Sequence, residues 1–141
     1  MATKISVIIP TYAPKDYLWE CLGSLENQTL SKDEFEVILV LNGEREPYEC
    51  LIQKKLPEYS FNSTLLYSTP NGVSRARNLG MDKAQGCYIC FIDDDDWVSD
   101  NYLAELLSNA CDNGIVEANV KDVDEQTREE SEQHFLSRAY K

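Results

Sequence analysis

Three things are scarce in this sequence of 141 residues: basic side chains, histidine and long apolar runs. Only 13 lysines and arginines face 25 aspartates and glutamates, so the formal net charge is -12. This charge argues against nucleic acid and anionic membrane surfaces as general partners, because both would be repelled. No stretch is apolar for long enough to span a bilayer, and the amino terminus lacks the layout of a signal peptide. We therefore expect a cytoplasmic protein without a transmembrane segment in this chain.

Cysteine is present but does not form a recognisable framework. The five cysteines are an odd number in a chain of ordinary domain size, so a set of disulfides is not expected. Cys87 and Cys90 have the spacing of a redox or metal-binding pair. They fall on a predicted strand, however, where side chains three residues apart point to opposite faces. We expect two buried thiols there.

The apolar residues that are present fall into short alternating segments. Their fraction, 43%, is enough for one domain with a real core. Apolar runs predict strands, and a period of three to four residues predicts helices. The predicted strands are residues 4–10, 35–41, 63–68, 86–93 and 114–120, and the predicted helices are residues 16–28, 47–56, 73–84 and 100–111.

This alternation of strands and helices predicts the fold class. It indicates an α/β protein with a Rossmann-like, mostly parallel sheet, right-handed crossovers and helices on both faces. We expect one nucleotide-sugar-binding region over residues 1–124. Residues 125–141 are polar and are expected to form a helix or a tail.

One stretch carries the chemistry: a short apolar run from Cys87 that ends in Asp93-Asp94-Asp95-Asp96-Trp97. The run predicts a strand buried on both faces, so the aspartates begin at the carboxyl end of the strand, where ligands bind in open α/β sheets. Adjacent carboxylates about 4 Å apart repel by roughly 1 kcal/mol in water and about 4 kcal/mol near a protein surface. A hard dication, Mn²⁺ or Mg²⁺, would offset this repulsion, held by Asp93 and Asp95 pointing the same way from an extended segment. The alternative is a solvated acidic turn, with Asp100 capping the next helix.

Three motifs in this order resemble family-2 glycosyltransferases of the GT-A fold. They are the opening strand Ser6-Val7-Ile8-Ile9-Pro10-Thr11-Tyr12, the segment Asn71-Gly72-Val73-Ser74-Arg75-Ala76-Arg77-Asn78-Leu79-Gly80, and Phe91-Ile92-Asp93-Asp94-Asp95-Asp96-Trp97, which matches the family's Asp-x-Asp signature. The resemblance covers the chain up to about residue 124. It implies transfer of a sugar from a nucleotide-diphosphate donor, most often a UDP-sugar, in polysaccharide or glycoconjugate synthesis.

The resemblance also implies roles for single residues. Asp95 would be the direct ligand of Mn²⁺ or Mg²⁺, with Asp93 beside it, and Asp93 and Asp94 would also lie against the ribose and the water shell of the ion. The other residues expected to contact the nucleotide are Pro10, Thr11, Tyr12, Asn42 and Arg77. Alternatives stay open for three side chains: Tyr12 could pack on its loop, Arg77 could pair with the aspartates, and Trp97 could be a packing anchor.

Two departures from the family pattern bear on function. The family's usual Asp-Asp-Gly-Ser turn is Leu41-Asn42-Gly43-Glu44 here, so an amide replaces the carboxylate that reads the base. Family members continue for roughly another hundred residues, which carry the acceptor site and a general base. No matching motif follows Asp122. We therefore expect the donor-binding part of a longer enzyme, whose acceptor is a saccharide or a lipid-linked saccharide at the inner face of the membrane.

Two other classes of function remain open from the sequence. A nucleotide- or metal-binding module without catalysis would show the same donor-side motifs. A phosphotransfer domain would also place aspartates at the edge of a sheet. In dehalogenase-type phosphatases, however, the motif lies on the first strand, and a receiver domain needs its aspartate after the third. Residues 63–69 contain no aspartate, which disfavours this class.

Overall fold

The computed structural model describes residues 2–69, 72–111, 114–115, 120–123 and 130–133. The chain divides into two compact units, residues 1–104 and residues 105–141, and each is described by itself. The first unit carries the sheet and every predicted site residue that the structure describes. The predicted boundary at residue 124 does not coincide with this division and stays a prediction.

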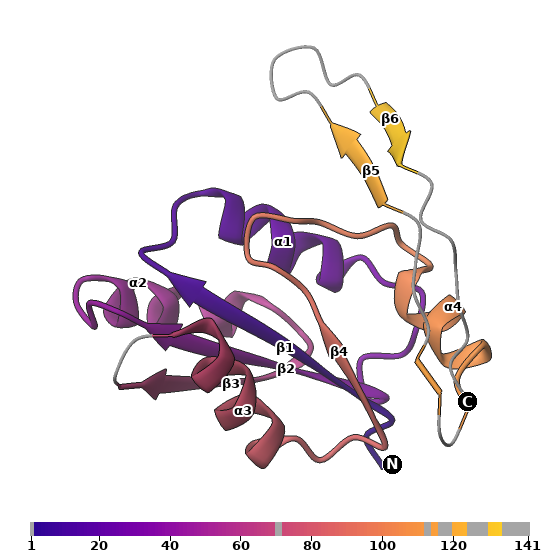
Figure 1. Cartoon of the computed structure of the whole chain (residues 1–141), viewed down its shortest axis with the longest axis horizontal. Coiled ribbons are helices and arrows are strands. Elements are labelled where there is room, and N and C mark those ends of the chain that lie inside the picture. Colours follow the sequence, from indigo (N-terminus) through magenta and orange to yellow (C-terminus); the bar gives the residue numbers. More distant parts are fainter. Residues whose placement is uncertain (1, 70–71, 112–113, 116–119, 124–129, 134–141) are drawn as a thin grey trace. The chain divides into compact units, whose positions relative to one another are not determined.

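The first unit is built on a four-stranded parallel sheet (Figure 1). Its strands are β1 (Ile5–Tyr12), β2 (Phe35–Asn42), β3 (Asn62–Ser68) and β4 (Tyr88–Phe91), in the spatial order β3-β2-β1-β4. Every neighbouring pair is parallel, which confirms the predicted parallel sheet. The central strands β1 and β2 are buried over nearly their whole length and mostly apolar, because both of their faces are covered.

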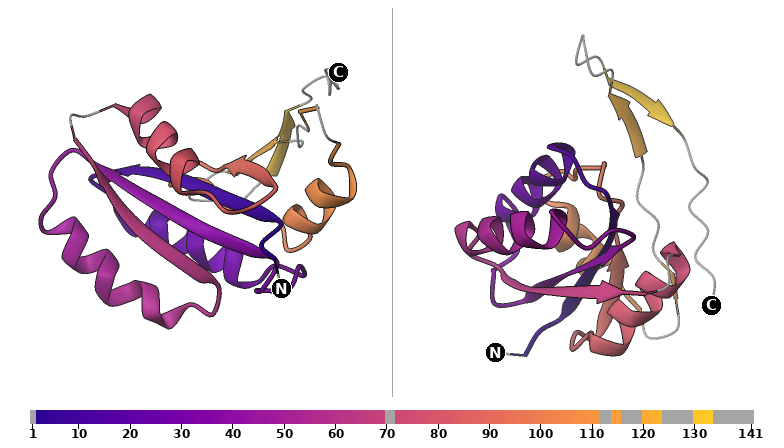
Figure 2. Two further views of the ribbon diagram at one scale, coloured as in Figure 1. Left: turned by 90° about the horizontal axis from the view of Figure 1, so that it is seen from below. Right: turned by 90° about the vertical axis from the view of Figure 1, so that its left-hand side faces the viewer.

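Helices cover both faces of this sheet, as predicted. They are α1 (Tyr17–Glu26), α2 (Tyr48–Lys55) with a 3₁₀ turn at Leu56–Glu58, and α3 (Val73–Lys83); a fourth helix, α4 (Tyr102–Ser108), follows the aspartates. In Figure 2, α1 and α2 lie on one face and α3 on the other. The inward stripe of α1 is formed by Leu18, Cys21, Leu22 and Leu25, all fully buried. None of the helices within the described ranges combines the length and hydrophobicity that a bilayer span requires.

The strand order determines where a ligand can bind. The chain builds the sheet outward from β1 through β2 to β3, and then returns to place β4 on the other side of β1. This reversal lies between β1 and β4, and open α/β sheets bind ligands beyond the carboxyl ends of such strands. Phe91, the last residue of β4, pairs with Ile8, whereas β1 continues to Tyr12. The residues after β4 can therefore run beside the end of β1.

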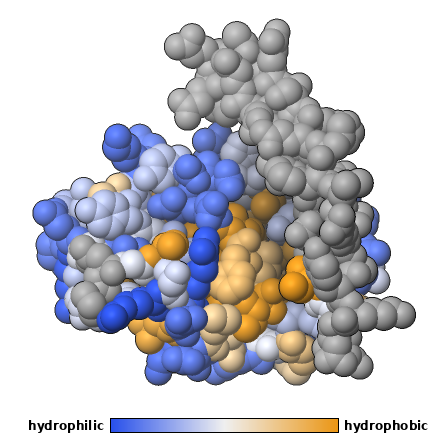
Figure 3. All heavy atoms as spheres, viewed as in Figure 1, coloured by the Kyte–Doolittle hydropathy of each residue, from blue (hydrophilic) through white to orange (hydrophobic). Residues whose placement is uncertain are grey.

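The prediction that the strand before the aspartates is buried on both faces was wrong. β4 is the edge of the four-stranded sheet, and Ile89 and Phe91 are each 43% exposed. Figure 3 shows apolar side chains gathered on the face that carries α3 and β4. Cys90 is buried as expected, but Cys87 is exposed, and both thiols are free. An apolar sequence indicates a strand but does not reveal how many neighbours that strand will have.

The second unit differs from the sequence-based expectation. Gly114 and Ile115 are not part of a strand, and residues 116–119 of the predicted fifth strand lie outside the described residues. Instead, β5 (Val120–Val123) pairs antiparallel with β6 (Glu130–Gln133) in a separate two-stranded sheet. A helix or tail over residues 125–141 therefore does not describe residues 130–133. Strand pairing requires a partner segment, which the polar composition of this region does not indicate.

Candidate functional site

The candidate site lies at the carboxyl edge of the four-stranded sheet. An open pocket of about 220 Å³ is found there, formed by the ends of β1 and β2, the first residue of α3 and the segment after β4. It is lined by Pro10, Thr11, Tyr12, Asn42, Val73, Asp93, Asp94 and Asp95. The structure thus brings together the predicted site residues from three distant parts of the sequence. Arg77 does not line the pocket but contacts it through Asp93.

The four aspartates form a turn, not the extended segment that the sequence suggested. The backbone N–H of Asp96 donates to the carbonyl oxygen of Asp93 at 3.1 Å, which closes the turn. One carboxylate oxygen from each of Asp93, Asp95 and Asp96 lies within 4.8 Å of the other two, and all three residues are exposed. Sequence reasoning named Asp93 and Asp95 but missed Asp96. A turn brings its first and fourth residues, here Asp93 and Asp96, close together. The run of four aspartates would have indicated Asp96 if a turn had been expected in place of an extended segment.

These three carboxylates make the edge strongly negative. Two unit charges 4.8 Å apart repel by about 1 kcal/mol in water and about 3.5 kcal/mol at an effective dielectric constant of 20. Part of this charge is offset by Arg77, whose guanidinium lies 3.5 Å from Asp93. The donor set consists of carboxylate oxygens alone, which suits Mg²⁺ or Mn²⁺ and does not suit softer metals. The residues present therefore fit a hard divalent cation.

Asp94 has a different role from its neighbours. Its carboxylate turns toward β1, where it accepts a hydrogen bond of 2.7 Å from the Thr11 hydroxyl. Burial raises the pKa of this carboxyl, and the charges of Asp95 and Asp93 raise it further, while the Thr11 hydroxyl and the Tyr12 backbone oppose the shift. Asp94 thus anchors the aspartate turn to the end of β1, which explains why only the other three form the carboxylate group.

Tyr12 and Asn42 shape the opposite side of the pocket. The Tyr12 ring is 59% exposed and lies against Gly43, where an added Cβ would be 2.3 Å from the ring carbon Cε2. Gly43 has φ of +87°, so glycine is required there for two reasons. The Asn42 side chain is buried, and its amide donates to the carbonyl oxygen of Thr11 at 3.1 Å. Tyr12 therefore packs against the turn that follows β2 and also presents an aromatic surface to solvent.

The structure bears on the alternatives that the sequence left open for Arg77 and Trp97. Arg77 pairs with Asp93, as one alternative had it, and its guanidinium carbon lies 5.8 Å from the centre of the Phe91 ring. Its Nε is buried without a hydrogen-bond partner. Whether Arg77 also reaches a nucleotide stays a prediction. Trp97 is 44% exposed, and its role as a packing anchor stays a prediction.

Comparison with known proteins identifies the family of this chain and several relatives. The model of the Glycosyl transferase family 2 matches residues 6–140. The chain is 34% identical over 103 residues to the glycosyltransferase GlyA of Streptococcus pneumoniae, which covers 73% of this chain and 14% of that protein. It is 30% identical over 102 residues to the poly(ribitol-phosphate) beta-N-acetylglucosaminyltransferase TarS of Staphylococcus aureus, covering 72% of this chain and 18% of TarS. The chain therefore spans less than one fifth of the length of these two relatives.

Solved structures agree with the sequence comparison. The structure of S. aureus TarS residues 1–349 in complex with UDP-GlcNAc matches with a TM-score of 0.67 and 30% identity, covering 75% of this chain and 30% of that one. The same portion of TarS has also been solved with UDP. A mannosyltransferase from Pyrobaculum calidifontis, at 22% identity and a TM-score of 0.62, shares the fold. The neighbours of this chain are GT-A glycosyltransferases, as the resemblance implied.

Proposed function

The chain belongs to glycosyl transferase family 2, and from this premise we propose that the carboxyl edge of its sheet binds the nucleotide diphosphate of a sugar donor. Binding depends on a divalent cation, Mn²⁺ or Mg²⁺, held by Asp95 and Asp93 with Asp96 beside them. The longer protein then transfers the sugar to a saccharide or lipid-linked acceptor in polysaccharide or glycoconjugate synthesis. We place this reaction in the cytoplasm or at the inner face of the membrane.

One observation carries the proposal: in a chain whose net charge is -12, three exposed carboxylates lie close together, and two of them, Asp93 and Asp95, line the pocket. A nucleoside diphosphate is itself an anion, so this edge repels it directly. A hard cation placed between the carboxylates and the diphosphate attracts both, so their mutual repulsion is replaced by two attractive contacts. Such ions usually bind through one or two carboxylates plus phosphate oxygens. The negative edge is therefore a reason for cation dependence and no obstacle to nucleotide binding.

The residues around the carboxylates hold the aspartate turn in place and form the surface for the base. Asp94 and Thr11 hold the aspartate turn against β1, so that the carboxylate oxygens keep their spacing. Tyr12 offers an exposed aromatic face on which a base can stack, and Asn42 is held in place by its contact with the Thr11 carbonyl. When bound, the cation supplies charge stabilisation for the diphosphate that leaves as the sugar is transferred.

The base of the donor is proposed to be uracil. Support comes from TarS, at 30% identity, which has been solved with UDP and with UDP-GlcNAc. Asn42 provides both a donor and an acceptor group near the pocket, in contrast to the carboxylate that is usual in the family. A thermal-shift comparison of UDP, GDP and dTDP with Mn²⁺ tests this choice, and a larger shift with GDP or dTDP would contradict it.

Isothermal titration of UDP-GlcNAc with and without Mn²⁺ tests the proposed site. We expect tighter binding with Mn²⁺ and loss of the Mn²⁺-dependent part, by about 100-fold or to below detection, in Asp95→Ala. Asp33→Ala is the matched control, because Asp33 is an exposed aspartate that precedes β2 at the opposite end of the sheet. Unchanged Mn²⁺-dependent binding in Asp95→Ala would place the cation elsewhere.

A binding module without catalysis is the second candidate. It is favoured by the fact that the described site residues all serve the donor side of the reaction. An assay for UDP release from UDP-GlcNAc, with and without saccharide acceptors, separates the two candidates. Release that depends on both Mn²⁺ and Asp95 supports an enzyme, whereas Mn²⁺-dependent binding without release supports the module.

A further inference from the structure

The segment that follows β4 lies along one side of α1. We call residues 93–103 the aspartate loop; it contains the four aspartates and ends at the first turn of α4. Figure 1 shows the trace after β4 passing beside α1 on its way to α4. The loop is therefore held by two supports, the end of β1 at Asp94 and the surface of α1 along the rest of its course.

Three side chains of the α1 region contact the aspartate loop one after another, in the same order along both segments. Cys21 donates its thiol hydrogen to the carbonyl oxygen of Asp93 at 3.8 Å, and the Ser24 hydroxyl accepts from the backbone N–H of Val98 at 3.1 Å. Gln28, just after the helix ends, contacts Ser99 and Leu103. The spacing of these side chains, three and then four residues, puts them on one side of the helix. Helix and loop advance in the same direction along this row.

Gln28 is the most fully engaged of the three. It is only 5% exposed, and its amide nitrogen donates to the carbonyl oxygens of Ser24 at 3.0 Å and Ser99 at 2.6 Å. Its amide oxygen accepts from the backbone N–H of Leu103 at 2.9 Å, one of the groups that the start of α4 cannot satisfy by itself. Of side chains of this length, only an amide supplies both donor and acceptor. Methionine would supply no donor and only a weak sulfur acceptor, and glutamate would direct a carboxylate at two carbonyl oxygens.

These contacts lie on either side of the carboxylate group. Asp95 and Asp96 lie between anchored residues: Asp94, held by Thr11, precedes them, and Val98 and Ser99, held by Ser24 and Gln28, follow them after one intervening residue. Residues outside the coordination shell that orient metal ligands typically change metal affinity by 10- to 100-fold when they are removed. We infer that Ser24 and Gln28 are positioning residues that fix the spacing of the carboxylates for the cation. This inference rests on the proposed function of the site.

Titration of the 141-residue chain with UDP, with and without Mn²⁺, tests the inference through Gln28→Met and Ser24→Ala. The Mn²⁺-dependent gain in UDP affinity is expected to fall about tenfold in Gln28→Met and about threefold in Ser24→Ala. UDP affinity without Mn²⁺ should stay within about twofold of wild type, because the surface formed by Tyr12 and Asn42 is unchanged. Each titration is run at a temperature where circular dichroism shows the variant to be fully folded.

Phe61→Leu is the control for a general loss of stability. Phe61 is buried and packs on Phe35 and Tyr59 at the amino ends of β2 and β3, the edge of the sheet opposite the pocket. It should lower the melting temperature and leave the Mn²⁺-dependent gain intact. An equal loss of this gain in Phe61→Leu, or a full gain in both Gln28→Met and Ser24→Ala, would overturn the inference. If the wild-type chain bound UDP with the same affinity with and without Mn²⁺, the proposed function would be overturned as well.

Discussion

The two edges of the parallel sheet differ in how their polar groups are satisfied: at the amino edge they bind one another, and at the carboxyl edge carboxylates are exposed to solvent. At the amino edge, the buried hydroxyl of Ser6 donates to Glu36 at 2.6 Å and accepts from the N–H of Gly86 at 2.8 Å, and the same carboxylate of Glu36 accepts from the N–H of Gln85 at 2.7 Å. Every group in this network meets a partner from another element of the first unit. The network joins β1, β2 and the turn before β4.

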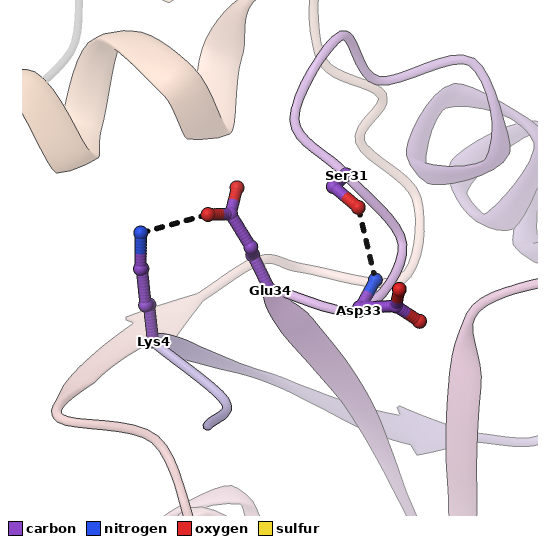
Figure 4. Close-up of polar contacts among 4 residues, drawn as sticks. All are labelled: Lys4, Ser31, Asp33 and Glu34. Carbon is purple, nitrogen blue, oxygen red and sulfur yellow. Dashed lines mark hydrogen bonds and ion pairs between the residues drawn. The ribbon is translucent and has the colours of Figure 1, made fainter. Parts of the chain in front are cut away.

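Other contacts close the amino edge further. Lys4 pairs with Glu34 at 2.7 Å, and the N–H of Asp33 donates to the Ser31 hydroxyl at 3.4 Å, as Figure 4 shows. The carboxyl edge carries three exposed carboxylates within 4.8 Å of one another and an aromatic ring that is 59% exposed. The comparison teaches that one edge of the sheet is arranged for stability and the other for a ligand of opposite charge.

The largest effect on stability is expected at the amino edge, from Gly86→Ala. A Cβ at residue 86 would lie 2.7 Å from the backbone nitrogen of Ser6 and 2.8 Å from the carbonyl carbon of Ile5. Backbone atoms of a central strand cannot move aside cheaply, so the free energy of unfolding should fall by about 2–3 kcal/mol. Urea denaturation measures this loss, and UDP affinity should remain unchanged.

Gly23→Ala is the matched control for this substitution. A Cβ at Gly23, in the middle of α1, would meet no atom within 4 Å. Alanine should therefore stabilise the chain by about 0.5–1 kcal/mol through helix propensity. Equal urea midpoints for the two variants would show that the close approach at Gly86 does not matter.

Thr11→Val breaks the contact that holds the aspartate turn to β1. Valine has nearly the same shape but cannot donate to Asp94, whose carboxylate is partly buried. We expect the free energy of unfolding to fall by about 1–2 kcal/mol, since one partner of a partly buried carboxylate is lost. Chemical denaturation measures the loss. Thr11→Ser, which keeps the hydroxyl, should recover most of it, and failure to do so would assign the loss to packing.

Arg77→Gln is expected to have a smaller effect, confined to the carboxyl edge. Arg77 offsets part of the charge of Asp93, so it competes with any cation at the same carboxylate. Removing it should raise the affinity for Mn²⁺ alone by about threefold at low salt and by less at high salt. Lys83→Gln, at the other end of α3, makes the same charge change and is the control. A fall in Mn²⁺ affinity in Arg77→Gln would contradict competition.

The smallest effect is expected for Glu26→Gln and depends on pH. Burial of Glu26 raises its pKa, but hydrogen bonds from the Ser60 hydroxyl and backbone outweigh this and lower the pKa overall. A lowered carboxyl pKa stabilises the fold above the unfolded value, about 4.3, and this contribution is lost as pH falls through the folded value. Because the group is only partly buried and solvent screens its charge, the difference should be a few tenths of a kcal/mol at pH 7. Thermal melts of both forms at pH 7 and pH 3 should differ only at pH 7.

Much of the fold could be predicted from local sequence patterns. Residues 37–41 form an unbroken apolar run because both faces of β2 are covered, and the period of Leu18, Cys21, Leu22 and Leu25 matches the buried stripe of α1. The place of the site could also be predicted, since the carboxyl ends of parallel strands share one edge. The expected contacts with a nucleotide and a cation stay predictions.

The parts that could not be predicted depend on partners that are distant in the sequence. The exposure of Ile89 and Phe91 follows from the edge position of β4, and the sequence of a strand does not encode its neighbours. The turn that brings Asp96 to Asp93 requires the chain to leave β4 while β1 continues. In the sequence, Gln28 follows an amphipathic helix and looks like an ordinary surface residue. It is buried only because it binds the aspartate loop at Ser99, 71 residues further along the chain.

Anomalous diffraction from crystals grown with Mn²⁺ and UDP tests the central claim most directly. The account predicts an anomalous peak in contact with a carboxylate oxygen of Asp95 and with Asp93 or Asp96, and with the diphosphate on its far side. A diphosphate bound at this edge without an ion, or an ion bound away from residues 93–96, would contradict it.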